Sequence, residues 1–317
     1  MKRLTACCLL PLLALASACS QAPEPGGSDA ADAAFTENAI EVPGFADFLA
    51  VDGDTVWTTN DGRVEQWSRD GLIESVAIPR PCGTMAILDG ALWVANCTDA
   101  NLYRVGIETC EVETVMETGL ANPRGETNVV AGAGSVWVPS DAEGTVARID
   151  PASDTVTARV DVVPGTFFLA FGEGALWAVS SDESLLQRID PETNAVTGKA
   201  DLGEQPGFLV AGEGAVWVQE QGDGTVARVD PETLEVTGRA EVGETLLYGD
   251  IDVGEGKVWL RTTEDQTFAV IDAETLEVID RVGRAEGSGA LRYTPEGIWT
   301  SAHDVQTLTW WAPAAAE

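Results

Sequence analysis

The chain contains a single histidine, His303, which is followed directly by Asp304. An imidazole titrates near neutral pH, so it can act as a general base, and an adjacent carboxylate can orient it. His303 is therefore the candidate catalytic residue, and its alternative role is that of a plain surface residue in a turn. One histidine cannot build a metal site of several imidazoles. The sequence also lacks GxSxG, P-loop, HExxH and CxxC motifs, so it assigns no residue to a metal site.

A second set of candidates combines arginines with aromatic residues that interrupt an otherwise regular sequence. The six candidate ligand-binding residues are Arg80, Arg124, Phe168, Phe208, Tyr248 and Arg261. Arginine side chains bind carboxylates and phosphates through paired hydrogen bonds, so such a cluster would form an anion-binding funnel. The alternative is that these arginines pair with acidic neighbours on the same surface.

The cysteines divide into an anchor, a pair and a lone thiol. Cys19 follows the run LASA, which resembles the lipobox of bacterial lipoproteins, so we expect it to be lipidated. Residues 81–97 form a predicted hairpin that sets Cys82 opposite Cys97. A disulfide there would close a 16-residue loop and contribute about 3 kcal/mol in an oxidising compartment. Cys110 falls in a turn at the other end of the same sheet, too distant to compete, and should be a free thiol.

Tryptophans reveal the elements that must position these residues. Seven of them recur at intervals of 36, 44, 40, 40, 42 and 40 residues: Trp57, Trp93, Trp137, Trp177, Trp217, Trp259 and Trp299. A period near 40 residues in a strand-rich sequence is typical of propeller blades, each of which needs a neighbour on both sides to bury its apolar faces. We predict an all-β, seven-bladed β-propeller with four-stranded antiparallel blades.

The clearest repeats, residues 168–207 and 208–247, each contain four predicted strands, named A to D in chain order. Connections from D to the next A and from B to C share one face of a propeller, here called the irregular face. The residues that map to it are Asp47, Phe48, Arg80, Arg124, Glu126, Phe167, Phe168, Phe208, Glu220, Tyr248, Arg261, Arg284, His303 and Asp304. The opposite face repeats GEG and DPET turns, so we expect ligand contacts on the irregular face.

The ends of the repeat predict how the ring closes. Only one strand follows Trp299, so the last blade lacks its outer strand. Residues 39–44 (AIEVPG) match residues 239–244 (RAEVGE), which precede a first strand elsewhere. We therefore predict that this N-terminal strand completes the seventh blade and removes an open edge. The propeller would span residues 39–313, with a tail at 314–317.

The N-terminus has the layout of an export signal. Residues 1–18 combine a basic start, an apolar run and small residues before Cys19, as in a secretory signal peptide. Residues 19–38 are rich in Pro, Gly, Ala and Asp and should form a lipidated, disordered tether. We expect an exported cell-envelope lipoprotein, on the periplasmic or outer face of a membrane, that meets the membrane through its lipid anchor only.

The net charge of the chain limits the kinds of molecule that it can bind. Without Lys2 and Arg3, the mature chain has 16 basic and 52 acidic residues, a net charge of −36. Nucleic acid phosphates would be repelled by most of this surface, which excludes nucleic acid. The expected partners are a small anionic ligand, a peptide or an envelope protein, and the expected state is a monomer.

The blade pattern AxGEGAVWV, GTVARIDPET and a following strand resembles the YVTN-type and virginiamycin B lyase-like (streptogramin lyase-like) propellers of bacteria. The resemblance covers about residues 39–313 and is strongest over 165–275. It implies a seven-bladed ring. Its lyase branch implies the opening of a cyclic peptide lactone by elimination, with a histidine base and a carboxylate-bound Mg²⁺, and only His303 can supply that base here.

Two functions from different classes follow. The one we expect is a membrane-tethered, extracytoplasmic binding module without a cofactor, which holds its ligand on the irregular face. The alternative is a Mg²⁺-dependent streptogramin lyase-like enzyme that cleaves a C–O bond by elimination.

Overall fold

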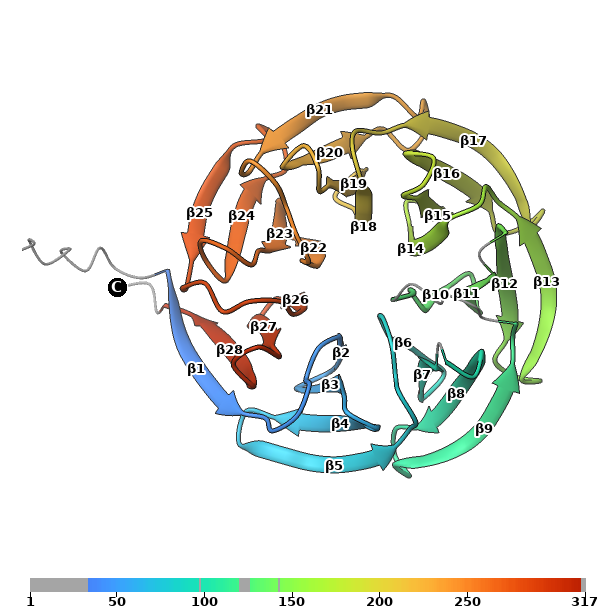
Figure 1. Cartoon of the computed structure of the whole chain (residues 1–317), viewed down its shortest axis with the longest axis horizontal. Helices are drawn as coiled ribbons and strands as arrows, with labels where there is room; N and C mark the ends of the chain where they lie inside the picture. Colours follow the sequence, from blue (N-terminus) through green and yellow to red (C-terminus); the bar gives the residue numbers. More distant parts are fainter. Residues whose placement is uncertain (1–33, 97, 120–125, 142, 315–317) are drawn as a thin grey trace, which may run out of the picture. The chain divides into compact units, whose positions relative to one another are not determined.

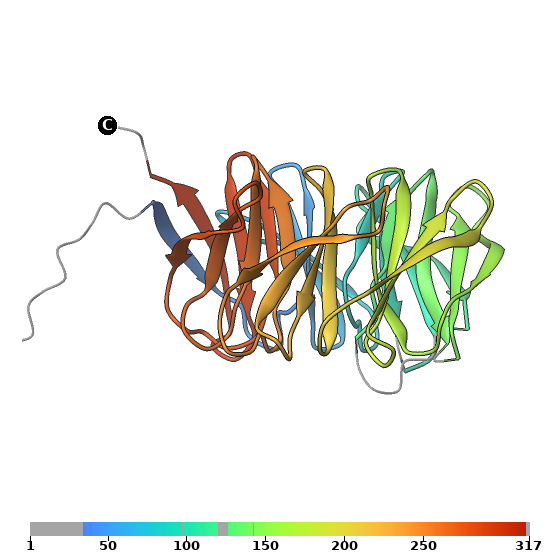
Figure 2. The same cartoon turned by 90° about the horizontal axis from the view of Figure 1, so that it is seen from above.

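The computed structural model describes residues 34–96, 98–119, 126–141 and 143–314. Within these ranges every named element is a β-strand, and 28 strands form seven four-stranded antiparallel sheets. The sheets stand around one axis as propeller blades (Figure 1), and their connections project to two opposite faces of the ring (Figure 2). The predicted seven-bladed, all-β propeller is confirmed. No helix in the described ranges could span a membrane. The predicted signal at 1–18 and the lipidation site Cys19 lie outside these ranges.

Each blade runs from strand A near the axis to strand D at the rim. Blade 1 consists of β2 (Leu49–Asp52), β3 (Thr55–Asn60), β4 (Arg63–Ser68) and β5 (Gly71–Ala77). Blade 2 consists of β6 (Ala86–Leu88), β7 (Ala91–Asn96), β8 (Asn101–Gly106) and β9 (Glu111–Glu117). Blade 3 consists of β10 (Val130–Gly132), β11 (Ser135–Asp141), β12 (Thr145–Asp150) and β13 (Thr155–Asp161). Blade 4 consists of β14 (Thr166–Gly172), β15 (Ala175–Ser180), β16 (Leu185–Asp190) and β17 (Ala195–Asp201).

The remaining blades follow the same order. Blade 5 consists of β18 (Pro206–Gly212), β19 (Ala215–Glu220), β20 (Thr225–Val229) and β21 (Val236–Glu241). Blade 6 consists of β22 (Ile251–Gly254), β23 (Lys257–Arg261), β24 (Phe268–Asp272) and β25 (Val278–Val282). Blade 7 consists of β26 (Leu291–Thr294), β27 (Gly297–Ala302), β28 (Thr307–Pro313) and, from the other end of the chain, β1 (Phe35–Glu41).

The N-terminal strand closes the ring as predicted, but it is longer than the sequence indicated. Strands β1 and β28 pair over seven residues, from Phe35 opposite Pro313 to Glu41 opposite Thr307. The strand begins at Phe35, four residues before the predicted boundary at residue 39. The Phe35 ring makes edge contacts with Trp259 and Phe268 of blade 6, at centroid distances of 6.1 and 5.7 Å. This apolar contact orders residues that had been assigned to the tether.

The repeated tryptophans pack between blades, and all seven are at most 4% exposed. In blades 3 to 6 the indole N–H donates to the carbonyl of a glycine five residues earlier, at 3.0 to 3.2 Å. That position also has little room: a Cβ at Gly132 would lie 2.0 Å from the Phe171 ring of the next blade. The glycine thus accepts the hydrogen bond of the buried indole N–H, and its lack of a side chain lets two neighbouring sheets approach closely.

The C–D turns fix the blades to one another on the face opposite the irregular face. Their leading aspartates accept backbone N–H groups, for example from Glu192 and Thr193 to Asp190, which lower the pKa of that carboxyl. Arg148 of strand C reaches across to the next turn, where it donates to the Pro191 carbonyl and to Asn194. The polar groups on this face therefore stabilise the turns and the contacts between neighbouring blades.

Candidate functional site

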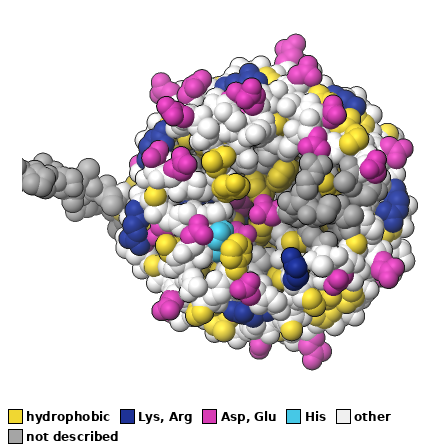
Figure 3. All heavy atoms as spheres, in the orientation of Figure 1, with side chains coloured by type: hydrophobic (Ala, Val, Ile, Leu, Met, Phe, Trp, Pro, Cys, Tyr) yellow, Lys and Arg dark blue, Asp and Glu magenta, His cyan; other side chains and the backbone are white. Residues whose placement is uncertain are grey.

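A cavity of about 340 Å³ opens at the centre of the irregular face. Among the described residues, its lining comes from six blades, all but blade 2: Asp47, Phe48, Glu126, Gly165, Phe167, Phe168, Ser181, Asp182, Phe208, Gln221, Tyr248, Gly249, Ser288 and Gly289. These residues belong to D–A and B–C connections or to the first residues of strand A. In Figure 3, which shows the face carrying the only histidine, hydrophobic and acidic side chains border the central hollow.

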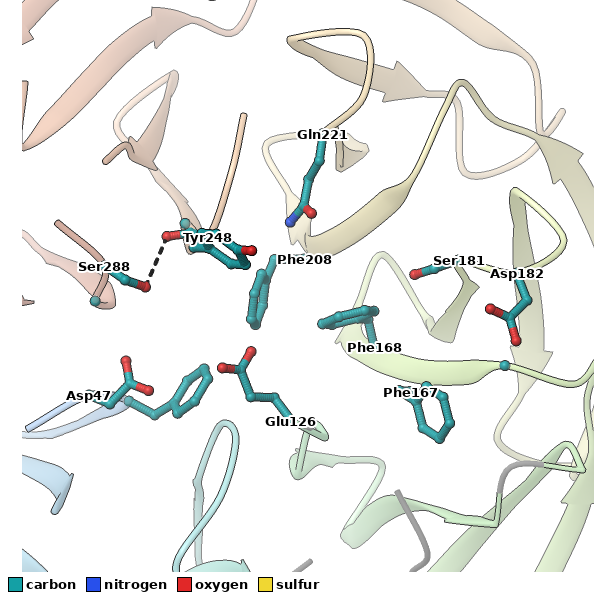
Figure 4. A pocket seen from close by; sticks show the side chains of 14 residues that line it. Asp47, Glu126, Phe167, Phe168, Ser181, Asp182, Phe208, Gln221, Tyr248 and Ser288 are labelled. Atoms are coloured by element: carbon teal, nitrogen blue, oxygen red, sulfur yellow. Dashed lines mark hydrogen bonds between the residues drawn. The ribbon is translucent and has the colours of Figure 1, made fainter. Parts of the chain in front are cut away.

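Aromatic side chains form one wall of the cavity. The rings of Phe168 and Phe208 are 4.9 Å apart in an edge-on arrangement, and Phe208 lies 6.0 Å from Phe48. Strands β14 and β18 both shift register near their start, between Thr166 and Phe168 and between Pro206 and Leu209. Such irregularities re-aim side chains, and here the two phenylalanines point toward the axis (Figure 4). Two of the aromatic residues predicted from the sequence therefore meet at one site.

Tyr248 completes the aromatic lining from blade 6. It precedes β22, has a positive φ of 57° and is 67% exposed. A left-handed backbone is costly for a tyrosine, and together with the exposed ring it marks a residue whose position is set by its connection and not by core packing. This prediction from the sequence is also placed at the cavity.

Carboxylates dominate the polar part of the lining. Asp47, Glu126 and Asp182 line the cavity, and its described lining contains no lysine or arginine. Burial, together with the negative charges of Glu126 and Asp250, raises the pKa of Asp47 well above its ordinary value. Glu126 is open to solvent through the cavity, yet protein atoms surround enough of it that desolvation and Asp250 raise its pKa as well.

Arg261 does not take the predicted ligand-binding position. It is 1% exposed at the end of β23, and its guanidinium donates to the carbonyls of Thr262, Thr267, Gly287 and Ser301. Burial lowers its pKa to about 10. These bonds join blade 6 to blade 7, so the side chain is an internal brace with no donor left for a ligand.

Arg80 is not part of the described cavity lining either. Arg80 is exposed in the connection to blade 2 and has a positive φ of 48°. Arg124 lies outside the described residues, as does Cys97, so the predicted disulfide with Cys82 stays a prediction. Cys110 is a free thiol, as expected.

His303 lies on the irregular face, beside the cavity and not in its lining. Its imidazole stacks on the Phe45 ring at a centroid distance of 3.9 Å, and its Nδ1 lies 3.2 Å from Asp304 Oδ1. The side chain is 12% exposed. Burial and the charge of Arg261 lower its pKa, while Asp304 opposes the shift, so the imidazole is neutral at pH 7. The imidazole can therefore accept a proton, but the stacked Phe45 ring covers one of its faces.

The carboxylates in the described ranges do not form the ligand set that a divalent metal requires. Among the described residues, no group of three or more His, Cys, Asp or Glu side chains is arranged to hold a metal ion. Asp250 is paired with Arg292, and Asp304 accepts a hydrogen bond from the backbone of Ser288. Mg²⁺ needs oxygen ligands in near-octahedral order, and these residues do not provide them.

The sequence assigned no binding role to Asp47, Glu126, Asp182 and Gln221. Asp47 and Glu126 mapped to the irregular face, so the available signal was their place before a first strand, next to aromatic residues. Asp182 and Gln221 lie in B–C turns and were not among the residues mapped to the irregular face. Glu220, also mapped to this face, is instead fully buried and paired with Arg239 at 2.7 Å.

Comparison with solved structures identifies the same fold in bacterial lyases. A catalytically inactive histidine-to-alanine variant of virginiamycin B lyase from Staphylococcus aureus, in a structure with quinupristin, superposes with a TM-score of 0.75 at 14% identity. The match covers 88% of this chain and 100% of that one. A streptogramin B lyase structure gives a TM-score of 0.74 at 14% identity, over 88% of this chain and 97% of that one. Neither a protein-family model nor a curated protein matches the sequence.

Proposed function

We propose that this protein is a binding module of the cell envelope that holds a small ligand in the central cavity of its irregular face. The observation that carries the proposal is the convergence of residues from six blades on one cavity with a continuous aromatic wall. Cavities of a few hundred Å³ with apolar walls and a few polar groups are the usual form of small-molecule sites. The tether and Cys19 would keep the ring close to a membrane surface.

The lyase is the second candidate. The fold shared with virginiamycin B lyase and the position of a neutral histidine on the same face favour it. Against it stand the packing of His303 on Phe45 and the lack of a fitted donor set for Mg²⁺ among the described residues. The binding module needs neither feature.

Ligand screening by thermal shift on residues 34–317 tests the proposal. A ligand that binds only the native state raises its melting temperature, and the increase grows with concentration. Phe168→Ala and Tyr248→Asn should reduce the shift at least severalfold, because asparagine accepts the left-handed backbone of residue 248 without disturbing the fold. The matched control is Glu192→Gln, an exposed residue in a C–D turn on the opposite face.

Incubation with quinupristin separates the two candidates. Elimination within a ring produces an isomer, so a lyase would change its chromatographic retention without changing its mass. Conversion that depends on Mg²⁺ and disappears in His303→Ala would replace the binding module by the lyase.

The proposed membrane attachment is tested separately. Cys19→Ala should move the protein from the membrane fraction to the soluble fraction.

A further inference from the structure

We infer that the central cavity recognises an organic monocation, a substituted ammonium group attached to an apolar body. The inference rests on the proposed binding function and names its ligand class. The cationic group would lie against the carboxylate of Asp47 with the negative charge of Glu126 beside it, and the apolar body would lie on the rings of Phe168 and Phe208. This reverses the anionic ligand that the sequence suggested.

Asp47 carries the electrostatic part of the argument. Its carboxylate receives no hydrogen bond from the described residues, although its side chain is partly buried and lines the cavity. A partly buried carboxylate without a partner is unfavourable unless an opposite charge approaches it. A ligand cation in the cavity would provide that charge.

Among the described residues, the charged groups around Asp47 do not supply a cation that bonds to its carboxylate. Glu126, Asp250 and Asp304 act on it with negative charge, and Arg261 is the positive group that opposes them. The donors of Arg261 are all directed to backbone carbonyls of blades 6 and 7. Arg261 therefore acts on Asp47 through its charge alone and makes no hydrogen bond to it, and the pKa of Asp47 stays above its ordinary value.

The aromatic wall decides between an organic cation and a metal ion. Faces of aromatic rings attract cations of diffuse charge and supply no oxygen ligand to a divalent metal. Phe48 and Phe208 are 5% exposed, so their rings are held rigidly, while Tyr248 is exposed at the rim and can cover a bound group. Together with the lack of a metal-type donor cluster in the described ranges, this favours an alkylammonium group.

Proton release provides an independent signature. A cation beside Asp47 favours the ionised carboxylate, so binding should release protons to the buffer at any pH where the free protein holds Asp47 protonated. Affinity should therefore increase with pH until Asp47 is ionised in the free protein. A ligand that bound only through apolar contacts would show no such dependence.

Three probes of nearly equal shape test the inference on the ring spanning residues 34–317. They are choline, its neutral carbon isostere 3,3-dimethylbutan-1-ol, and the anion 3,3-dimethylbutanoate. Calorimetry and NMR titration should show choline binding at least tenfold more tightly than the alcohol, with the anion weakest. In Asp47→Asn, and separately in Glu126→Gln, this preference should fall below threefold, while Glu192→Gln should keep it. Titrations in two buffers of different ionisation enthalpy should show proton release that Asp47→Asn abolishes.

Each contrary result has a distinct meaning. Equal binding of choline and the alcohol at this cavity would overturn charge recognition and leave the binding module standing. Preference for 3,3-dimethylbutanoate that Arg124→Gln removes would restore the anionic ligand. No saturable binding of choline by any method would reject the cation, and the broader thermal-shift screen would then decide the proposed function on its own.

Discussion

The ring of Phe45 lies parallel to the imidazole of His303, at an interplanar angle of 20°. Phe45 belongs to the connection that follows β1, and His303 to the B–C turn of blade 7, so the stack joins the first and last parts of the ring on the irregular face. This contact gives the only histidine a structural role that its sequence context did not reveal.

His303→Ala should therefore lower the stability of the ring by about 1 kcal/mol, the usual contribution of an aromatic pair, and leave choline binding within twofold of wild type. His303→Phe keeps the stack and should recover most of the loss. Urea denaturation measures both. A total loss of turnover or binding in His303→Phe, with stability retained, would instead assign a catalytic role to the imidazole.

The lowered pKa of His303 predicts a pH effect with a defined sign. The native state binds this proton more weakly than the unfolded chain does, so the contribution is intact above pH 6.5 and is lost as the pH falls below it. The melting temperature of wild type should fall between pH 6.5 and 5 more steeply than that of His303→Phe. Parallel pH profiles would contradict this prediction.

Asp47→Asn should make the protein more stable at pH 7. Because the pKa of Asp47 is raised, its ionisation opposes folding once the pH exceeds the unfolded value of 3.8, and an amide removes that penalty. The gain should be on the order of 1 kcal/mol at pH 7 and should vanish below pH 3.8. Asp61→Asn, an exposed change in the same blade, should have no effect. A destabilised Asp47→Asn would indicate that the carboxylate has an internal partner.

Glu220 shows the opposite behaviour. Burial alone would raise its pKa, but hydrogen bonds from Arg239, Thr225 and the backbone of Gly203 outweigh burial and lower it. Its contribution is present above pH 4.5 and is lost as the pH falls. Glu220→Gln should cost about 2 to 3 kcal/mol at pH 7, a moderate cost because Arg239 is partly exposed and water can solvate its guanidinium. The cost should shrink as the pH falls below 4.5 and the wild-type carboxylate takes up a proton. Glu241→Gln on the outer strand of the same blade is the control.

Phe35→Ala should destabilise the ring by about 2 kcal/mol, since it removes edge contacts with Trp259 and Phe268 from the closing strand. Thr36→Ala, exposed on the same strand, should be nearly neutral.

Removing residues up to 33 should leave the melting temperature unchanged, whereas removing residues up to 41 should lower it sharply. Equal melting temperatures for both truncations would mean that β1 does not hold the ring closed.

Non-reduced peptide mapping of exported protein should find Cys82 joined to Cys97 and Cys110 alkylated. The described contacts place Cys82 beside the end of β7, directly before residue 97: Pro81 pairs with Asn96, and the Cys82 N–H donates to the Ala95 carbonyl. A bridge that includes Cys110 would overturn the assignment.

The architecture was predictable because it depends on a local pattern repeated seven times. The tryptophans, GEG turns and DPET turns recur in the same order along the chain. Their period therefore predicts the number of blades and the closure of the ring without knowledge of distant contacts. The start of β1 was not predictable, since Phe35 is ordered by Trp259 and Phe268, more than 200 residues away in the sequence.

The site was predictable only in part. Phe168, Phe208 and Tyr248 could be assigned to the irregular face because they break the repeat at the start of a first strand, and the structure brings them to one cavity there; their contact with a ligand stays a prediction. Arg261 looked equally irregular, but its partners are backbone carbonyls that become available only when blades 6 and 7 pack together. The sign of charge in the cavity depends on Asp47 and Glu126 meeting across the ring, which no local pattern encodes.

The antiparallel seam between β1 and β28 also determines how the ring yields to force. Phe35 lies opposite Pro313, and the Ala314 N–H donates to Ala34, so both ends of the propeller leave from the same corner. Force that pulls the two ends apart breaks the residue pairs between β1 and β28 one after another. Force directed along the strands would have to break all seven pairs at once. The propeller is therefore expected to open at blade 7 under low force, with its other six blades intact.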